Sequence, residues 1–532
     1  MSEVLQQPCS HGSTPSAHAR SGEVQAKLAN VDNPKDPFLP MNLSWSQLRG
    51  FMAGSPPLKA REVGGVAGGE LGAKPSEARL IARIQTDSRS LLPGDFFIAL
   101  KGEQFDGHDY LGQVKDKGAV GAVAHSGLLK AGLPGFEVED STLALGEVAH
   151  AWRAQFDLGL IAVTGSNGKT TVTQMVASIL RAWMGQAALA TQGNFNNAIG
   201  VPLTLLRLRA HHRVGVLELG MNHEGEIANL ARWVSPQVAL VNNAQREHQE
   251  FMGSVEAVAI ENGHVLEALR KGGVAVFPMD DAYASLWTTM AGQASCCMFG
   301  RKPGAQVQLL DHDWLGGHYS LQVLTPQGEV SLTLHMAGEH NVDNALASVA
   351  CCVSLGVPLS AVSEGIASFR AVSGRGQLHQ VTTSTGIITL VDDTYNANPD
   401  SVLAAIDVLK NLPRPHVLVL GDMGEVGESG EQYHEEVGKY ASACGIDVLL
   451  TMGDLSQCSA RAFAPQPPSQ EATCPNAFEP TAAGLTQLLA ALDVQLERCG
   501  SVLVKGSRFM RMERVVQHVL SQSATQKGLS CS

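Results

Sequence analysis

The sequence has little that would place the protein in a membrane or on a nucleic acid. No apolar run in its 532 residues approaches the ~20 that a membrane-spanning helix requires. Lysine and arginine number 38 against 51 acidic residues. The resulting net charge of −13 argues against nucleic-acid binding, because such binding needs clustered cations that replace counterions. We therefore expect no membrane span and no nucleic-acid partner.

Two further absences concern the cysteines and the N-terminus. The ten cysteines include no C-x-x-C pair, which in a chain of this length argues against a zinc site or a disulfide framework. Residues 1–40 are polar and lack the apolar segment of a signal peptide. We expect a flexible N-terminal tail on a cytoplasmic protein, which we take to be a monomer.

What is present is an alternation of strand and helix patterns, typical of α/β domains with parallel sheets. The length predicts about three domains at roughly 150 residues each. We place them at residues 41–150, 151–372 and 373–520, followed by a flexible tail at 521–532. The Gly-rich joint "SGRGQ" opens the third domain, and residues 455–480, rich in Pro, Ser and Gln, predict a surface loop.

The segment Val163–Thr171, "VTGSNGKTT", resembles a phosphate-binding loop whose first glycine is displaced. The usual pattern, G-x-x-x-x-G-K-[ST], fits at Gly168, Lys169 and Thr170, but its first position is a valine and the glycine comes at Gly165. An apolar strand precedes the loop and an amphipathic helix follows it, which is the required context. Because helix N-terminal N–H groups favour bound phosphate, we predict a nucleotide site. A turn that contains GKTT by chance is the alternative.

Two polar residues near the ends of apolar strands are candidate metal ligands. Glu218 is the single acid of "VGVLELG", and an acid within a buried strand is costly unless it is paired or binds a metal. His248 follows the strand "VALVNN", although a lone loop histidine is more often simply solvated. Ligands in open α/β sheets bind at the carboxyl ends of strands, which is where both residues are expected.

Seven motifs in one order resemble the Mur ligases, ATP-dependent enzymes that form amide bonds in peptidoglycan synthesis. Three of them, "GNFNNAIGVPLTLL", "DDTYNANP" and "KGSRFMRME", resemble the branch of the family that adds D-alanyl-D-alanine. The seven are "TGSNGKTT" (164–171), "GNFNNAIGVPLTLL" (193–206), "ELGMNHEGEI" (218–227), "GEHNVDNALA" (338–347), "DDTYNANPDS" (392–401), "LGDMGEVGE" (420–428) and "VLVKGSRFMRMERVV" (502–516).

The resemblance implies an α/β enzyme of three domains: a small N-terminal domain for the UDP end of the substrate, a central P-loop ATPase domain with a mostly parallel sheet, and a C-terminal Rossmann-like domain. It implies ATP and Mg²⁺ as cofactors and UDP-MurNAc-tripeptide and D-Ala-D-Ala as substrates. The implied reaction passes through an acyl phosphate and gives the UDP-MurNAc-pentapeptide.

The same resemblance assigns roles to residues of this chain. Catalysis would involve Lys169, Glu218, His248 and Arg375, and the metal would be bound by Thr170, Glu218 and His248. ATP would be contacted by Thr164, Gly165, Ser166, Asn167, Gly168, Lys169, Thr170, Thr171, His340, Asn341 and Asn344. Substrate contacts would be Ser88 and Arg89 at the UDP end, Thr191, Asn196 and Asn197 along the sugar–peptide, and Asn396, Asn398, Lys505, Ser507 and Arg508 in the C-terminal domain. Simple turns and helix caps are the alternatives for the asparagines and for "VKGSR".

One position departs from the family pattern. Many relatives carry a lysine fourteen residues after the metal-site histidine, carbamylated by CO₂ and helping to hold a second Mg²⁺, and the same count from His248 reaches Asn262. Asparagine cannot form a carbamate, and its neutral amide is a weaker ligand for a hard cation. A second metal would be held through water, by Glu261, or only once the acyl phosphate forms; alternatively, Asn262 is a helix residue without a metal role. In each case we expect no need for bicarbonate.

Two other interpretations stay open at this point. One is a different ATP-dependent amide ligase of the same superfamily, such as a tripeptide synthase or a folate polyglutamylase, against which "DDTYNANP" and "KGSR" argue. The other is a P-loop regulator that binds ATP and ligates nothing. It would turn over ATP without any UDP-sugar.

Overall fold

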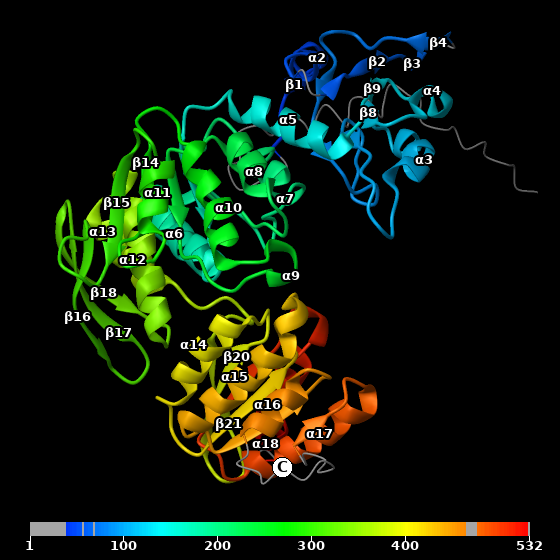
Figure 1. Ribbon diagram of the computed structural model, residues 1–532. Helices are drawn as coiled ribbons and strands as arrows, with labels where there is room; N and C mark the ends of the chain where they lie inside the picture. The colour runs from blue at the N-terminus through cyan, green and yellow to red at the C-terminus, as the bar shows by residue number, and fades with distance from the viewer. Residues whose placement is uncertain (1–38, 56–57, 68–69, 464–475, 530–532) are drawn as a thin grey trace, which may run out of the picture. The chain divides into compact units, whose positions relative to one another are not determined.

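The computed structural model describes residues 39–55, 58–67, 70–463 and 476–529, which form two compact α/β units (Figure 1). The first unit ends at Ala144 and the second begins at Leu145. The predicted N-terminal tail lies outside the described residues up to position 38. Within the described residues, no helix is long and apolar enough to cross a membrane.

The first unit is built on a small sheet with strand order β2-β9-β8-β7-β6, parallel except for the edge pair β2–β9. Its core is aromatic, since Trp45 is fully buried and stacks on Phe136 at 5.6 Å between ring centroids. The strands are β1 (Leu43–Ser44), β2 (Arg61–Val63), β3 (Gly65–Ala67), β4 (Glu70–Ala73), β5 (Leu80–Ile81), β6 (Ile84–Gln85), β7 (Phe96–Ile98), β8 (Gly121–Ala124) and β9 (Gly135–Glu137), and the helices are α2 (Trp45–Ala53), α3 (Leu111–Asp116) and α4 (Leu128–Ala131).

The second unit contains a nine-stranded sheet with strand order β11-β12-β10-β13-β14-β15-β16-β17-β18. The pairs from β11 to β16 are parallel, and β16, β17 and β18 form an antiparallel meander. The strands are β10 (Gly159–Thr164), β11 (Ala188–Ala190), β12 (Val214–Glu218), β13 (Val238–Val241), β14 (Val274–Pro278), β15 (Ser295–Gly300), β16 (Val307–Trp314), β17 (Tyr319–Thr325) and β18 (Gly328–Leu334).

Helices pack against this sheet. Apolar residues of α6, α12 and α13 share one core with the sheet, which is why the i, i+3, i+4 pattern after the phosphate-binding loop predicts a helix. The helices are α5 (Ser141–Arg153), α6 (Lys169–Met184), α7 (Gly200–Leu205), α8 (Glu226–Val234), α9 (Gln249–Met252), α10 (Val255–Glu267), α11 (Ala284–Met290), α12 (Glu339–Ser354) and α13 (Leu359–Ser368). Strand β10 lies between β12 and β13, so the chain crosses from one side of it to the other. That crossing creates the crevice in which α/β proteins bind ligands.

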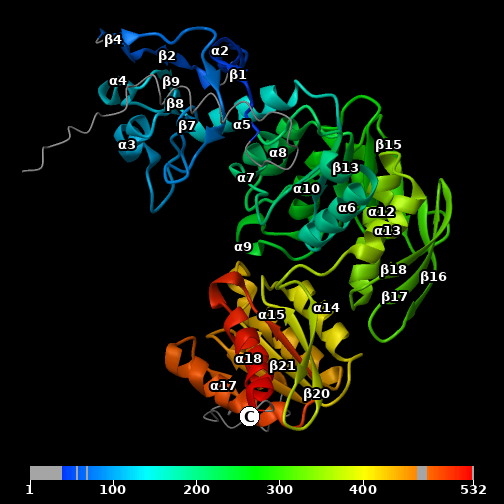
Figure 2. The same cartoon turned by 180° about the vertical axis from the view of Figure 1, so that it is seen from behind.

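A six-stranded sheet with order β19-β20-β24-β21-β22-β23 follows, parallel except for β19. Helices cover both faces, as Figure 2 shows from behind. Val417 and Val419 belong to the core shared with α17 and α18, whereas Leu418 and Leu420 belong to the core shared with α14 and α15. This explains the uninterrupted apolar run of β21. The elements are β19 (Gln377–Thr382), β20 (Ile387–Asp393), α14 (Pro399–Leu409), β21 (His416–Gly421), α15 (Gly430–Ala443), β22 (Val448–Met452), α16 (Ser456–Phe463), β23 (Ala477–Phe478), α17 (Ala482–Leu496), β24 (Ser501–Lys505) and α18 (Glu513–Leu529).

The α/β fold class with mostly parallel sheets is confirmed, but one local expectation is wrong in part. The expected surface loop 455–480 contains α16 and β23 at its ends, and only residues 464–475 lie outside the described part. Ser459 of α16 is fully buried against α15 and donates to the carbonyl of His434 at 2.6 Å, so a loop-like composition conceals a closely packed helix. Helix α18 extends to Leu529, into the segment 521–532 that the sequence places in a C-terminal tail, and the flexibility of that tail stays a prediction.

Candidate active site

The phosphate-binding loop joins β10 to α6 and depends on two glycines. Gly165 has φ +127° and Gly168 has φ +83°, conformations that disfavour side chains. A Cβ on Gly168 would lie 2.3 Å from Oδ1 of Asn344. Val163, at the position of the missing glycine, is fully buried in β10. The loop is therefore shortened at its strand end and keeps the glycines that its backbone requires.

Lys169 begins α6 and folds back over this loop. Its Nζ donates to the carbonyls of Gly165 at 2.7 Å and Ser166 at 3.0 Å. The same ammonium forms an ion pair with Oε1 of Glu247 at 2.5 Å. Three oxygens therefore surround the one cation of the phosphate-binding loop.

Glu218 ends β12 and faces the start of α6. Its Oε1 accepts from the hydroxyl of Thr170 at 3.1 Å and from Nδ2 of Asn196 at 2.8 Å. Thr191 fixes the strand end by accepting from the Glu218 N–H at 3.0 Å. The carboxylate is buried, and its Oε2 has no hydrogen-bond partner among the described residues. A hydroxyl beside an unsatisfied carboxylate oxygen is a donor set that suits Mg²⁺.

His248 lies beyond β13 in a left-handed conformation, with φ +49°. Its Nδ1 is 2.5 Å from Oε2 of Glu425, and its Nε2 is 3.5 Å from Oε1 of Glu247. Burial acts to lower the pKa of His248, but the two carboxylates outweigh it and raise the pKa to about 9. Among the described residues, no three His, Cys, Asp or Glu side chains are grouped to hold a metal. The histidine is thus paired with two acids in this structure, and its role as a metal ligand stays a prediction.

Asn262 lies in α10 directly beneath the loop. Its Oδ1 accepts from the hydroxyl of Thr164 at 2.6 Å and from the N–H of Gly165 at 3.1 Å. Neighbouring Glu261 accepts from the N–H groups of Gly225 and Ile227 at 2.9 and 2.8 Å, at the start of α8. Both side chains are buried, and both already accept hydrogen bonds from backbone N–H groups. This geometry favours a structural role for them over metal binding.

The residues expected near adenine begin α12. Asn344 accepts from Nδ2 of Asn242 at 3.0 Å and donates to Asn341 at 3.0 Å. Asn242 also donates to the carbonyl of Asn167 at 2.8 Å, so buried amides connect α12 to the phosphate-binding loop. His340 is exposed, with its Nε2 3.0 Å from Nδ2 of Asn341.

Two further asparagines lie at the starts of helices. Asn197 accepts from the N–H groups of Ile199 at 3.2 Å and Gly200 at 3.0 Å at the start of α7. Asn398 caps α14 by accepting from Ser401 N–H at 2.8 Å, and its Nδ2 donates to Oδ1 of Asn167 at 3.0 Å. The side chain of Asn398 therefore connects the start of α14 to the phosphate-binding loop.

The basic residues of the C-terminal region differ in how many partners their side chains already have. Lys505 is buried and donates to Asp393 at 2.6 Å and to the carbonyl of Asn396, an exposed residue, at 2.9 Å. Arg375 and Arg508 lie over the ring of Tyr395, with guanidinium carbons 4.1 and 5.8 Å from its centroid. Arg508 also pairs with Oε1 of Glu513 at 3.4 Å, whereas the side chain of Arg375 has no ion pair among the described residues.

Ser507 links the loop that contains Ala397 to the loop that contains Gly424. Its hydroxyl donates to the carbonyl of Ala397 at 3.1 Å and accepts from the N–H of Gly424 at 2.6 Å. The side chain is buried and does not face solvent. Its two hydrogen bonds hold the backbone in place.

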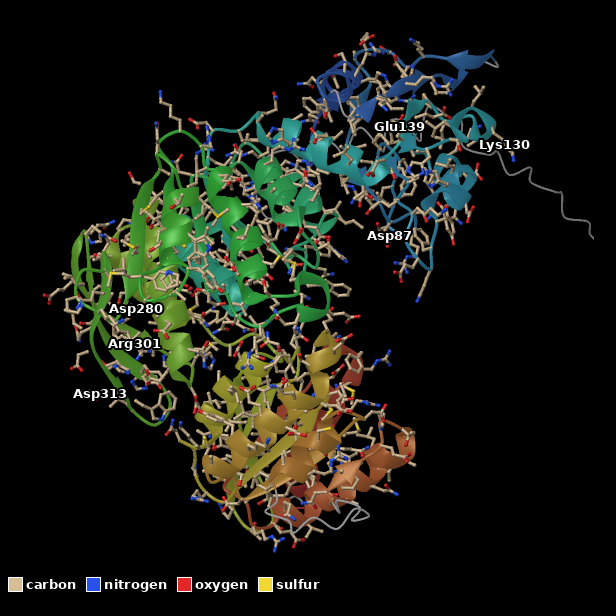
Figure 3. The ribbon with its side chains drawn as sticks, in the orientation of Figure 1. Asp87, Lys130, Glu139, Asp280, Arg301 and Asp313 are labelled. Carbon is tan, nitrogen blue, oxygen red and sulfur yellow. The ribbon has the colours of Figure 1, made fainter. Side chains whose placement is uncertain are left out.

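Ser88 and Arg89 lie in the first unit, just beyond the strand β6. Ser88 is buried, and its carbonyl accepts from Nζ of Lys117 at 2.7 Å. The guanidinium of Arg89 pairs with Asp87, labelled in Figure 3, at 2.8 Å, and its hydrogen bonds lower the pKa of Asp87 to about 2. The side chain of Arg89 is 89% exposed, so water and a phosphate can both reach it.

Sequence reasoning missed the charged contacts around His248. Arg246 pairs with Asp400 at 2.6 Å and with Glu436 at 2.7 Å, and Glu247 pairs with Lys169. The only signal was the density of charge in "QREHQE". That density does not identify partners that lie far away in the chain.

Comparisons with known proteins agree over most of the chain. Family models match residues 80–153 (Mur ligase family, catalytic domain), 163–352 (Mur ligase middle domain) and 374–508 (Mur ligase, glutamate ligase domain). UDP-N-acetylmuramoyl-tripeptide–D-alanyl-D-alanine ligase of Haemophilus influenzae is 38% identical, with 82% of this chain and 93% of the relative covered. The Escherichia coli protein of that name is 39% identical, with 82% and 92% covered. The crystal structure of MurF from Acinetobacter baumannii is similar with a TM-score of 0.79 at 32% identity, covering 91% of this chain and all of that one.

Proposed function

The chain belongs to the Mur ligase family, and we propose that its phosphate-binding loop and Glu218 serve the ATP-dependent addition of D-alanyl-D-alanine to UDP-N-acetylmuramoyl-tripeptide. The product is the UDP-MurNAc-pentapeptide precursor of peptidoglycan. The observation that carries the proposal is the unsatisfied buried carboxylate oxygen of Glu218 beside Thr170 and the phosphate-binding loop, in a chain whose near-full-length relatives carry this reaction in their names.

The reaction needs ATP because a carboxylate oxygen is a poor leaving group. Transfer of the γ-phosphate to the tripeptide carboxylate makes an acyl phosphate, and the amine of D-Ala-D-Ala then attacks its carbonyl carbon and expels phosphate. The difficulty is electrostatic, since two unit charges 4 Å apart repel by about 4 kcal/mol at an effective dielectric constant of 20. Positive charge and N–H donors at the phosphates reduce this repulsion.

Within the loop, Lys169 is the residue that we assign to the phosphates, together with the N–H groups at the start of α6. The hydroxyl of Thr170 and the carboxylate of Glu218 would hold Mg²⁺, which when bound supplies positive charge to the triphosphate. Asn196, hydrogen-bonded to Glu218, keeps the carboxylate in place. We assign His248 to the edge of this site, paired with Glu425.

The substrate ends are assigned to other parts of the chain. We assign the exposed guanidinium of Arg89 to the UDP diphosphate, because guanidinium and phosphate pair through two parallel hydrogen bonds. Arg375 and Arg508, at Tyr395, are assigned to anionic groups of the substrates. Lys505 and Ser507 support the loop around Asn396. We retain 41–150, 151–372 and 373–520 as the proposed boundaries of the three functional domains.

Phosphate release tests the proposal directly. We expect release to require both the UDP-MurNAc-tripeptide and D-Ala-D-Ala, with little turnover when either is omitted. Equal turnover with ATP alone would support the P-loop regulator instead. Release driven by a single amino acid in place of the dipeptide would support a different ligase of the superfamily.

A further inference from the structure

Glu247 forms an ion pair with Lys169, the lysine of the phosphate-binding loop. Its Oε1 lies 2.5 Å from Nζ of Lys169, and only 13% of the lysine side chain and 11% of the glutamate side chain are exposed. The second oxygen, Oε2, is buried and has no hydrogen-bond partner among the described residues. A carboxylate so little solvated is strongly attracted to a neighbouring cation. The carboxylate of Glu247 therefore occupies the position beside the Lys169 ammonium at which a phosphate would bind.

The residues on either side of Glu247 are held by the C-terminal part of the same unit. Arg246 pairs with Asp400 at 2.6 Å, and its backbone N–H donates to the same carboxylate at 2.8 Å. His248 pairs with Glu425 at 2.5 Å. Because both neighbours are fixed, the backbone of Glu247 is fixed as well, and its carboxylate is directed at Lys169. The pair is thus part of a built arrangement and not a chance surface contact.

We propose that Glu247 competes with nucleotide phosphate for Lys169 and so sets the affinity of this chain for nucleotides. The inference rests on the proposed function only in taking Lys169 as a phosphate ligand. A carboxylate and a phosphate oxygen are both anionic acceptors for an ammonium group, and one Nζ that already donates to two carbonyls has room for one of them. A nucleotide must displace the carboxylate before it gains the lysine.

Binding of ADP to the full-length protein tests this competition without any turnover. Glu247→Gln keeps the shape of the side chain and removes its charge, so we expect ADP to bind roughly tenfold more tightly, the size of effect expected when a charge-assisted hydrogen bond no longer competes. Glu247→Asp keeps the charge but draws it back by one methylene, and it should give a smaller gain. Glu250→Gln makes the same charge change at an exposed position of the same segment and should leave ADP affinity unchanged.

Two results would overturn the proposal. ADP affinity that is unchanged or weaker in Glu247→Gln means that the carboxylate does not compete with phosphate. An equal gain in a Lys169→Ala background would mean that Glu247 merely repels phosphate, with no part played by the lysine.

A second measurement addresses the ion pair itself in nucleotide-free protein. The rate at which an amine-acylating reagent modifies Lys169, followed by mass spectrometry of its peptide, should rise in Glu247→Gln, because the amine loses its closest acceptor. An unchanged rate would contradict the pairing. Neither measurement uses the muramoyl substrate or D-Ala-D-Ala, so a failure of the competition is distinguishable from a failure of the ligase function.

Discussion

At the scale of single residues, Lys169 has the clearest consequence for activity. Lys169→Ala should lower phosphate release by about two to three orders of magnitude, the loss typical of removing one group that stabilises transition-state charge. The protein should remain folded, because the side chain lies over the loop and outside the apolar core. Phosphate release and a thermal melt of the same preparation measure the two effects. Near-normal turnover would show that the loop is misassigned.

Asn262 leads to a prediction about carbon dioxide. Its amide oxygen is shared by Thr164 and Gly165 and cannot carry a carbamate. We expect the ligation rate to be unchanged when CO₂ is stripped from the assay, whereas a relative with lysine at this position should slow and recover on adding bicarbonate. A bicarbonate-dependent rate in this chain would mean that another lysine has the role.

The residues of the site differ in how far the sequence could predict them. Thr170 and Glu218 follow from local patterns, one at the end of a glycine loop and the other within an apolar strand, and the structure joins them at 3.1 Å. Glu247 could not be predicted, because its partner lies 78 residues away and their meeting depends on the order of β10 and β13 in the sheet. For Asn398 the sequence leaves both a substrate contact and a helix cap open; the structure shows the cap, and the substrate contact stays a prediction.

At the scale of elements, the start of α14 is a point where stability can be measured. Asn398 accepts from the Ser401 N–H, and replacement of such a cap by alanine costs about 1 kcal/mol. We expect Asn398→Ala to lower the free energy of unfolding by about that amount, measured with urea. Asn398→Ser, which keeps a side-chain oxygen that can cap the helix and should retain most of the stability, is the matched control. Equal losses in both variants would argue against the cap.

The elements themselves were largely predictable, with one instructive exception. Apolar runs such as Val417–Leu420 and the amphipathic pattern of α6 predict strands and helices because burial alone determines them. Helix α16 buries serine, alanine and cysteine against α15, where a side chain on Gly438 would come within 2.2 Å of the Ser459 carbonyl. Small residues that pack backbone against backbone have no apolar period, so the sequence suggested a loop.

At the scale of the whole molecule, the N-terminal tail provides a test of what the enzyme needs. Residues 1–38 lie outside the described structure, and their polar composition predicts that they cannot bury enough apolar surface to fold alone. Deleting them should leave the melting temperature and the kinetics of ligation nearly unchanged. A drop of several degrees in the melting temperature would show that the tail packs on the rest of the protein.

The central claim is that this chain joins D-alanyl-D-alanine to a UDP-muramoyl tripeptide, and the mass of the product tests it most directly. Purified protein is incubated with ATP, Mg²⁺, UDP-MurNAc-tripeptide and D-Ala-D-Ala, and the UDP-linked species are analysed by mass spectrometry. We predict a new species heavier by one D-Ala-D-Ala unit less one water, formed in step with ADP and absent when any one component is omitted. ADP formation with an unchanged tripeptide mass would contradict the account.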